Sequence, residues 1–358
     1  MRNVSIPDFV RGNPYTTITL TDRINKVSFV PGFLGSLGSR LFGSSGITNT
    51  SIAMEAIEGR IKILKTSSRG SPAQQGTNPK AGMLKSVPVA HIKKERTANA
   101  DEIQSAITYA EMTGEPLKAT IENLLFQQME GPFGLRQEFN LTHEYHRLGG
   151  IQGLVLDADG SELYNWYDYF SIAPPADVTI DFGAFTADKT DFDQLCTELH
   201  RAVSVELSGL PFTNMSIMVL CSSTLYDAAR NNKEVVAARK NRDQGKEGDV
   251  FVGGAAFKNF RYGGFTWVDY RGTDDGVVSI EQGTARLFPI DVPGLFQQLF
   301  GPPDIIGMTN MPGMPIFDFL PPSRQTERQL VQEAQSNVIT VCTRPKALRK
   351  LKMGASST

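Results

Sequence analysis

Two short segments of the chain carry side chains that could do chemistry. His143, Glu144 and His146 could offer ligands to a metal ion, and Ser222, followed by Thr224 after an apolar run, could form a nucleophile turn. HEYH is not the HExxH motif, and a histidine pair three residues apart on a polar helix usually lies at the surface. A serine that opens a helix without the G-x-S-x-G pattern is usually an N-cap. The sequence therefore predicts no catalytic site, no bound metal and no cofactor.

Other polar groups do not complete such a site. Asp291, Asp304 and Asp318 lie among prolines, and no base or metal-ligand spacing unites them. A soluble enzyme that uses the two histidines or Ser222 stays the alternative from a different class of protein. Bound metal, or a defined monomer with a deep polar pocket, would favour that alternative.

The cysteines and the apolar runs restrict the compartment. Cys196, Cys221 and Cys342 are odd in number, and their spacing matches no disulfide framework, zinc site or redox motif. The N-terminus lacks the apolar core of a signal peptide, and no run approaches the roughly 18 apolar residues that span a membrane. We therefore expect a protein that is cytosolic when it is made and that contacts no membrane.

The charges are segregated along the chain, although the formal net charge is only -2. The segment from Gly59 to Lys94 has eight basic residues and no carboxylate. Within it, β-like runs at 61–65 and 84–93 flank a tip rich in small and polar residues, which is typical of a long hairpin with Pro88 at an edge. Such a hairpin is marginally stable in water unless another surface covers it. The sequence therefore predicts an arm that needs a partner, and the best partner is another copy of the chain.

An acidic stretch lies downstream of this arm. From Asp157 to Glu198 there are ten acidic residues against one base, Lys189. A basic arm and an acidic body within one chain favour docking between copies. The simpler alternative is that both are solvated surface. The basic run at 344–352 could likewise contact phosphate or another protein, or form a solvated tail.

The first part of the chain predicts a compact α+β unit behind an extended arm. Apolar residues at helical spacing from Phe33 to Phe42 predict a short segment that docks on a surface. Gly149 and Gly150 should end the second of two helices. The elements predicted for this unit are a helix at 116–129, a helix at 142–148, a tight turn at 157–160 and strands at 151–156 and 162–170.

A second α+β unit is predicted after the boundary at Pro174 and Pro175. Its predicted elements are a helix with an apolar stripe at 192–207, a strand at 217–221, a helix at 224–242 and strands near 250–251, 265–270 and 277–281. A last apolar strand, 337–342, has no local partner. It should therefore return to the sheet of the first unit.

Four stretches together resemble the lambda-type tailed-phage major capsid proteins, often called the capsid protein E family. The strongest is THEYHRLGGIQGLVLDADGSELYNWYDYF, residues 142–170, where helix end, paired glycines and DADG turn follow in the family's order. The others are ARLFPIDVPGLFQQLFGPPDIIGMTNMPGMPIF (285–317), AQSNVITVCTRPKALRKL (334–351) and LFGSSGITNTSIAMEAIEGRIKILKTSSRG (41–70). The four stretches together span most of the chain and follow one another in the family's order.

The resemblance implies an α+β fold of the Hong Kong 97 capsid type. On this chain it implies an N-terminal arm at 1–50, an extended β-hairpin loop at 51–104, a peripheral domain with a spine helix at 105–171 and 320–358, and an axial domain at 172–319.

The implied function is that of a major capsid protein, which needs no active site. Family members form pentamers and hexamers of an icosahedral shell around packaged double-stranded DNA. The resemblance therefore implies self-association, contact with DNA at the inner surface without sequence specificity, and a portal, a scaffold and a decoration protein as partners. The protein would reside in the virion capsid after assembly in the host cytoplasm. An encapsulin-like cellular compartment is the alternative within the same fold, and the cargo of purified particles, nucleic acid or enzyme, would decide.

The predicted contact sites between copies follow from charge and apolar pattern. Charge would supply the register, and burial of apolar side chains would add stability. The predicted hairpin contacts are Arg60, Ile61, Lys62, Ile63, Lys65, Arg69, Lys85, Val87, Val89 and Lys93. The predicted acidic partner surface consists of Asp157, Asp159, Glu162 and Asp168.

Overall fold

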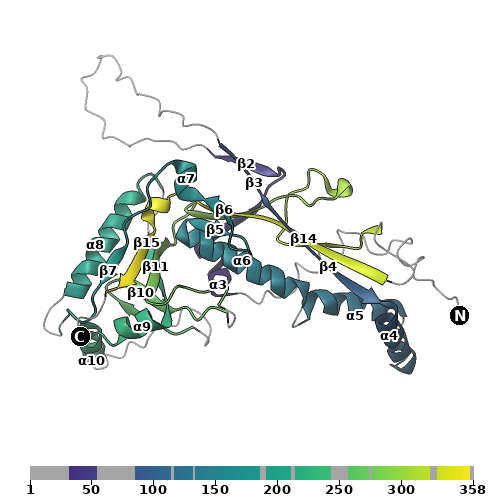
Figure 1. Cartoon of the computed structure of the whole chain (residues 1–358), viewed down its shortest axis with the longest axis horizontal. Coiled ribbons are helices and arrows are strands. Elements are labelled where there is room, and N and C mark those ends of the chain that lie inside the picture. The colour runs from purple at the N-terminus through teal and green to yellow at the C-terminus, as the bar shows by residue number, and fades with distance from the viewer. Residues whose placement is uncertain are drawn as a thin grey trace, which may run out of the picture.

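The computed structural model describes residues 32–54, 85–113, 117–131, 134–185, 191–210, 214–242, 257–273, 276–322 and 329–354. Figure 1 shows an elongated molecule with a β-sheet in each half and the long helix α6 running between them. The predicted α+β class is confirmed.

The described helices fall into two groups, those of the N-terminal half and those after residue 190. They are α3 (Phe33–Ser36), α4 (Ala100–Thr113), α5 (Leu117–Glu130), α6 (Leu135–Gln152), α7 (Trp166–Phe170), α8 (Asp191–Glu206), α9 (Ser223–Arg230) and α10 (Lys233–Arg242). Short 3-10 turns are η1 (Gly38–Arg40), η2 (Ile306–Met308) and η4 (Pro345–Ala347).

The described strands form two large sheets and two hairpins. They are β1 (Phe42–Gly46), β2 (Ser51–Met54), β3 (Lys85–Pro88), β4 (Ala90–Asn99), β5 (Leu154–Leu156), β6 (Glu162–Asn165), β7 (Val178–Ile180), β8 (Ser216–Cys221), β9 (Asn259–Tyr262), β10 (Phe265–Asp269), β11 (Thr284–Ile290), β12 (Phe296–Phe300), β13 (Phe317–Phe319), β14 (Gln329–Cys342) and β15 (Arg349–Met353).

The six-stranded sheet has the order β7-β15-β11-β8-β10-β9. Its central strand β8 is apolar on both faces, as expected for a strand that helices or loops cover on both sides. Helix α8 buries an apolar stripe in the core of this half, and the ring of Phe192 at the start of the stripe lies 5.6 Å from that of Trp267 on β10. Both rings are fully buried, so this half of the molecule has an apolar interior.

The five-stranded sheet contains β1, β12, β14 and β13 in that order, and β4 pairs with β14 as well. The 14-residue β14 is its axis, with Gln335 opposite Lys93 in the antiparallel ladder to β4. Apolar residues of α5 and α6 pack on one face of this sheet, among them Leu125 near Leu330 and Phe139 near Ala334.

The predicted strand at 337–342 is confirmed as part of β14, which pairs with β4 and so returns to the first unit. The sheet pairing crosses the predicted domain bounds at five strands. β1 and β4 join the five-stranded sheet, although 1–50 was assigned to the N-terminal arm and 51–104 to the hairpin loop. β15 joins the six-stranded sheet, although 320–358 was assigned to the peripheral domain, and β12 and β13 join the five-stranded sheet, although 172–319 was assigned to the axial domain. The chain crosses between the sheets through η4, so the C-terminal segment serves both.

The paired glycines do not end the spine helix, and that prediction is wrong. Helix α6 ends at Gly153, whose φ of +78° is the left-handed conformation of a helix C-cap. A Cβ on Gly149 would lie 2.8 Å from the backbone of β5, and one on Gly150 would lie 2.6 Å from Thr340 Cγ2. The missing side chain at Gly149 therefore lets the backbone of β5 approach α6, and the missing side chain at Gly150 makes room for Thr340 of β14. Neither glycine forms a turn.

The second strand predicted at 162–170 ends early. Asn165 caps α7 instead, because its side chain accepts hydrogen bonds from the backbone N–H groups of Tyr167 (3.1 Å) and Asp168 (3.3 Å). Trp166 is buried and donates from Nε1 to the carbonyl of Thr340 at 3.1 Å. The turn at 157–160 is confirmed by the bond from Asp157 N to the carbonyl of Ser161.

The other predicted elements had mixed outcomes. Predictions at 116–129, 192–207, 217–221 and 265–270 are confirmed as α5, α8, β8 and β10. The helix predicted at 224–242 is two helices, because Asn232 accepts a hydrogen bond from Glu234 N and starts α10 afresh. No strand forms at 277–281, and the run at 250–251 lies outside the described residues.

The predicted hairpin run at 84–93 is divided. Its first part is β3, which pairs with β2, whereas its second part belongs to β4 and pairs with β14. The run at 61–65 lies outside the described residues. In the part of the chain that the structure describes, no helix is long and apolar enough to cross a membrane.

Candidate functional site

The root of the arm is the two-stranded ladder of β2 and β3, which places Val87 opposite Ile52. This root packs against β6 and α7 of the same chain. Tyr164 Oη donates to the carbonyl of Pro88 at 3.0 Å, and Tyr169 Oη donates to the carbonyl of Lys85 at 2.5 Å. Lys85 Nζ in turn donates to the carbonyl of Tyr169 at 2.7 Å and lies 5.5 Å from the centre of its ring. The root is therefore held in one direction (Figure 1).

The hydroxyl of Tyr164 is a donor at neutral pH, and burial moves its pKa further from neutrality. Burial raises the pKa of Tyr164 to about 12. Tyr164 also stacks on the buried Trp166, with ring centroids 5.7 Å apart. Strand β6, against which the root of the arm packs, is thus tied to the interior of the molecule.

The predicted acidic partner surface lies on the same unit. Asp157, Asp159, Glu162 and Asp168 are all exposed, on the β5–β6 turn, on β6 and in the first turn of α7. Hydrogen bonds from the side chain and backbone of Ser161 lower the pKa of the Asp159 carboxyl. The structure therefore gathers four carboxylates next to the root of the arm.

The predicted hairpin contacts separate into two sets. Arg60, Ile61, Lys62, Ile63, Lys65 and Arg69 lie outside the described residues. Four others lie within the fold of their own chain. Val87 and Val89 pack on the main core, Lys85 bonds to Tyr169, and Lys93 lies in β4 with its Nζ 3.0 Å from Glu333 Oε1. Their contact with a neighbouring copy stays a prediction.

A second anchor, which the sequence did not reveal, holds the segment before β1. Glu144 on α6 accepts hydrogen bonds from the backbone N–H groups of Leu34 (2.7 Å) and Gly35 (3.0 Å). Burial raises the pKa of Glu144, and these bonds oppose the shift. A Cβ on Gly32 would lie 2.4 Å from Glu144 Cδ, so only glycine fits there. The predicted docking of the apolar segment 33–42 is confirmed, and its surface is the chain's own spine helix.

The histidine pair does not lie at the surface, and that expectation is wrong. His143 and His146 are each 2% exposed, and His143 lies against Phe300 and Ser336 of the five-stranded sheet. His143 Nε2 lies 2.8 Å from the hydroxyl of Ser336. Burial lowers the pKa of His143 well below its ordinary value and that of His146 to about 4, so both rings are neutral at pH 7.

The chemistry of the remaining candidates is limited as well. Ser222 stands at the N-cap position of α9, but its hydroxyl makes no capping bond and lies 3.4 Å from Thr224 Oγ1. Burial raises the pKa of Cys196, Cys221 and Cys342, so the thiols stay protonated. Within the described ranges, no group of three His, Cys, Asp or Glu side chains could hold a metal ion.

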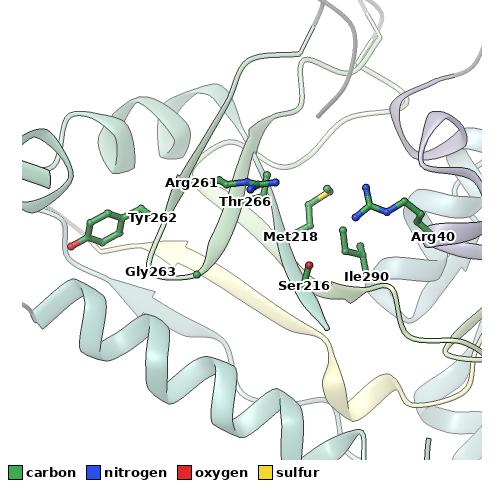
Figure 2. A pocket seen from close by; sticks show the side chains of 9 residues that line it. Arg40, Ser216, Met218, Arg261, Tyr262, Gly263, Thr266 and Ile290 are labelled. Atoms are coloured by element: carbon green, nitrogen blue, oxygen red, sulfur yellow. The ribbon is translucent and has the colours of Figure 1, made fainter. Parts of the chain in front are cut away.

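One pocket of about 290 Å³ opens at the end of the six-stranded sheet. Figure 2 shows Arg40 and Arg261 on opposite sides of Met218. Arg40 is engaged by Asp291, which accepts from its Nε and Nη2 at 2.8 Å each. The residues that line the pocket include no His, Cys, Asp or Glu that could act as a general base for the hydroxyls of Ser216 or Thr266.

The C-terminal basic run is part of a strand rather than a solvated tail. Lys350 Nζ lies 2.7 Å from Glu281 Oε2, and Lys352 Nζ lies 2.5 Å from Asp177 Oδ2. These pairs fasten β15 to its surroundings in the six-stranded sheet. Surface pairs of this kind contribute little stability individually.

Comparison with known proteins identifies the class of molecule. The family model for phage major capsid protein E matches residues 16–353. The chain is 23% identical over 357 residues to the major capsid protein of Salmonella phage Felix O1 (isolate Felix O1-VT1), covering 92% of this chain and 94% of that one.

Two solved capsid structures are similar to this chain over most of its length. The capsid of an empty GTA particle matches with a TM-score of 0.48 at 12% identity, over 92% of this chain and 93% of that chain. The capsid of Myoviridae phage XM1 matches with a TM-score of 0.46 at 12% identity, over 92% and 94%. Because the match to the family model spans almost the whole sequence, this chain belongs to the phage major capsid protein E family and is a structural component of a virion capsid.

Proposed function

We propose that copies of this chain form the pentamers and hexamers of an icosahedral shell around packaged double-stranded DNA, with the hairpin arm of each copy lying across the acidic surface of a neighbour. The observation that carries the proposal is the fixed root of the arm beside four exposed carboxylates. A fixed root gives the arm a defined starting point on the subunit, which supports docking on a defined neighbour.

Opposite charges and the many contacts that each subunit makes would stabilise this shell. The arm is basic from Gly59 onward, and the surface formed by Asp157, Asp159, Glu162 and Asp168 is acidic, so attraction selects the register of docking. Each exposed ion pair contributes little by itself. Many contacts per subunit in a closed shell add up to a stable particle.

The proposed parts of the subunit follow the sheets. The N-terminal arm (1–50), hairpin loop (51–104), peripheral domain (105–171 with 320–358) and axial domain (172–319) are kept except at five strands. β15 goes to the axial domain, and β1, β4, β12 and β13 go to the peripheral domain, because strands of one sheet move together.

The proposed role is structural rather than enzymatic, with assembly in the host cytoplasm. A scaffold, a portal and a decoration protein are the proposed partners. DNA would contact the inner surface without sequence readout, through phosphate attraction alone.

Charge reversal in the arm tests the proposal. Lys62→Glu with Lys65→Glu should leave a folded subunit, because neither change touches the described core, but should prevent shell formation. Lys233→Glu with Lys258→Glu is the matched control, since both lysines are exposed on the body of the molecule. Particles counted by electron microscopy give the readout, and normal shells from the arm variant would contradict the docking proposal.

A charge swap sharpens the test. Adding Asp159→Lys and Glu162→Lys to the arm variant restores attraction with reversed signs, and we expect particles to return. The two acidic-surface changes alone should block assembly as the arm changes do. If the arm variant, the acidic-surface variant and the combined variant all fail to form particles, the arm docks elsewhere on the neighbour.

A further inference from the structure

The pocket at the end of the six-stranded sheet brings together two arginines from distant parts of the chain. Arg40 comes from η1, before β1, and Arg261 comes from β9. Figure 2 shows their guanidinium groups pointing toward one another across the pocket, with Met218 between them. Like charges that face each other repel, so this arrangement favours an anion between them.

The described chain balances only one of these two positive charges. Asp291 accepts from Nε and Nη2 of Arg40 at 2.8 Å each. Arg261 is exposed, and among the described residues it has no carboxylate within ion-pair distance. Asp193 lies near the turn at Gly263, but it belongs to α8 and does not line the pocket. The pocket therefore carries one uncompensated positive charge.

The lining of the pocket suits the end of one acidic side chain. A guanidinium group presents paired N–H donors that match the two oxygens of a carboxylate. The hydroxyls of Ser216 and Thr266 can also donate, and the buried Met218 and Ile290 supply an apolar part. A recess of about 290 Å³ admits a protruding side chain, whereas the phosphates of a DNA duplex lie along a stiff convex rod. A protein carboxylate is therefore the better fit.

Helix α8 carries a carboxylate that lacks a partner. The acidic residues of this helix, against the single arginine Arg201, are Asp191, Asp193, Glu198 and Glu206. The first two stand in the first turn, where the helix dipole compensates negative charge, and Glu206 interacts with Arg349. Glu198 is exposed in the middle of the helix, and the described chain places no cation within ion-pair distance of it.

The pocket and α8 lie on opposite faces of the six-stranded sheet. Thr266 of β10 stands opposite Arg261 and Met218 in the ladders to β9 and β8, so these three residues share the face of the pocket. Trp267 points to the other face, where its ring lies 5.6 Å from that of Phe192 on α8. Complementary groups on opposite sides of one subunit suit head-to-tail contact between identical copies.

We propose that the pocket of one copy binds the Glu198 carboxylate of a second copy. Arg261 would donate to this carboxylate, together with Nη1 of Arg40, which does not bond to Asp291. The inference rests on the proposed self-assembly and adds a contact independent of the basic arm. The occupant is a second copy because each chain carries both halves of the contact and copies meet in a capsid.

A carbodiimide tests the contact, because it joins an amine to a carboxylate as an amide and takes up the lost water as a urea. Arg261→Lys keeps the positive charge and places an amine in the pocket. Particles assembled from two isotope-labelled batches of this variant should yield peptides that join position 261 of one label to Glu198 of the other, identified by mass spectrometry. Arg230→Lys, at the end of α9 and outside the lining, is the matched control and should give no link to Glu198.

The outcomes separate this inference from the proposed function. Intact particles in which position 261 is linked to another segment, only within one copy, or not at all overturn the contact and leave shell formation standing. Absence of particles from the unaltered chain overturns both.

Charge reversal tests the contact without a crosslinker. Arg261→Glu and Glu198→Lys should each lower the number of particles about tenfold or more, since each places like charges in contact. Each subunit should melt at the unaltered temperature, because neither residue has an ion pair in the described chain. Combining the two changes should return particles, and Lys233→Glu, exposed on α10, should assemble normally. Normal particle numbers from Arg261→Glu would overturn the inference.

Discussion

The two sheets of this subunit have interiors of different chemistry. Of the eighteen buried polar residues of the described chain, thirteen lie on α6, β12, β13 or β14, around the five-stranded sheet. The six-stranded sheet instead buries Trp267, Phe265, Phe288 and other apolar side chains. Burial of apolar side chains therefore holds the half with the six-stranded sheet together, and we call it the apolar half. Directional hydrogen bonds hold the half with the five-stranded sheet in register, and we call it the polar half.

The segment before β1, the loop between β12 and β13 and the root of the arm are each held by hydrogen bonds. Glu144 holds the segment before β1, Asn337 and Ser336 hold the loop that carries Ile306, and Tyr164 holds the root of the arm. Hydrogen bonds fix direction, which apolar contact does not. A shell subunit must present its arms at set angles, so a polar interior on this side suits its function.

This interior also carries polar atoms without a hydrogen-bond partner. They include Nδ2 of Asn140, Nε2 of Gln298, Oε1 of Gln332 and Oγ1 of Thr340. Each such buried atom costs free energy of desolvation, of order 1–3 kcal/mol. We expect the amides of the polar half to exchange hydrogen faster than those of β8 and β10.

The largest effect should come from the apolar half. Trp267→Ala removes a fully buried ring that lies 6.0 Å from the ring of Phe260 and 5.6 Å from that of Phe192. We expect a loss of about 3–5 kcal/mol in the free energy of unfolding, measured by urea denaturation. Trp267→Phe should lose clearly less, and equal losses would show that ring volume is not what stabilises this core.

In the polar half, breaking one ion pair should be nearly as costly. Arg136 Nη1 lies 2.8 Å from Glu130 Oε1, and each side chain is only 7% exposed. Arg136→Met leaves the Glu130 carboxylate buried without its cation, which should cost about 3–5 kcal/mol in urea denaturation.

Removal of both charges is the control for this pair. Glu130→Leu with Arg136→Met should recover most of the stability, since no buried charge is left uncompensated. A double variant as unstable as Arg136→Met alone would mean that the interior depends on bonds other than this pair.

Acid should destabilise the polar half through its histidines. Because burial lowers the pKa of His146 from 6.5 to about 4, the unfolded chain binds a proton in this range that the folded chain refuses. Stability should therefore fall as the pH drops from about 6.5 to about 4, by on the order of 3 kcal/mol. Unfolding curves at several pH values test this, with His146→Gln as the control that should show a flatter dependence.

The smallest effect should come from the exposed pair at the edge of the six-stranded sheet. Arg40 and Asp291 form a bidentate pair, which raises the pKa of Arg40 and lowers that of Asp291, but the Arg40 side chain is 52% exposed. Arg40→Ala should cost only about 0.2–1 kcal/mol, and less at high salt. A loss as large as that of Arg136→Met would show that burial is not what distinguishes the two pairs.

Local signals predicted the elements of the apolar half well. The stripe at 192–207 and the apolar run at 217–221 became α8 and β8, because a core of this kind selects apolar residues with the period of each element. In the polar half the same rule predicted α5 and the end of β14 but missed the buried histidines. His143 and His146 are polar and buried on α6, and no periodicity of apolar residues marks a polar side chain as interior.

By itself the sequence determined the α+β class, the DADG turn, the apolar segment before β1 and the segregation of basic and acidic residues, since each depends on composition and near neighbours. Only the tertiary structure decided the rest. It kept Gly149 and Gly150 inside a helix where β5 and β14 approach, divided the run at 84–93 between two sheets, and clamped the loop of Ile306. These features depend on which distant segments meet, and that is set by the packing of the whole chain rather than by local pattern.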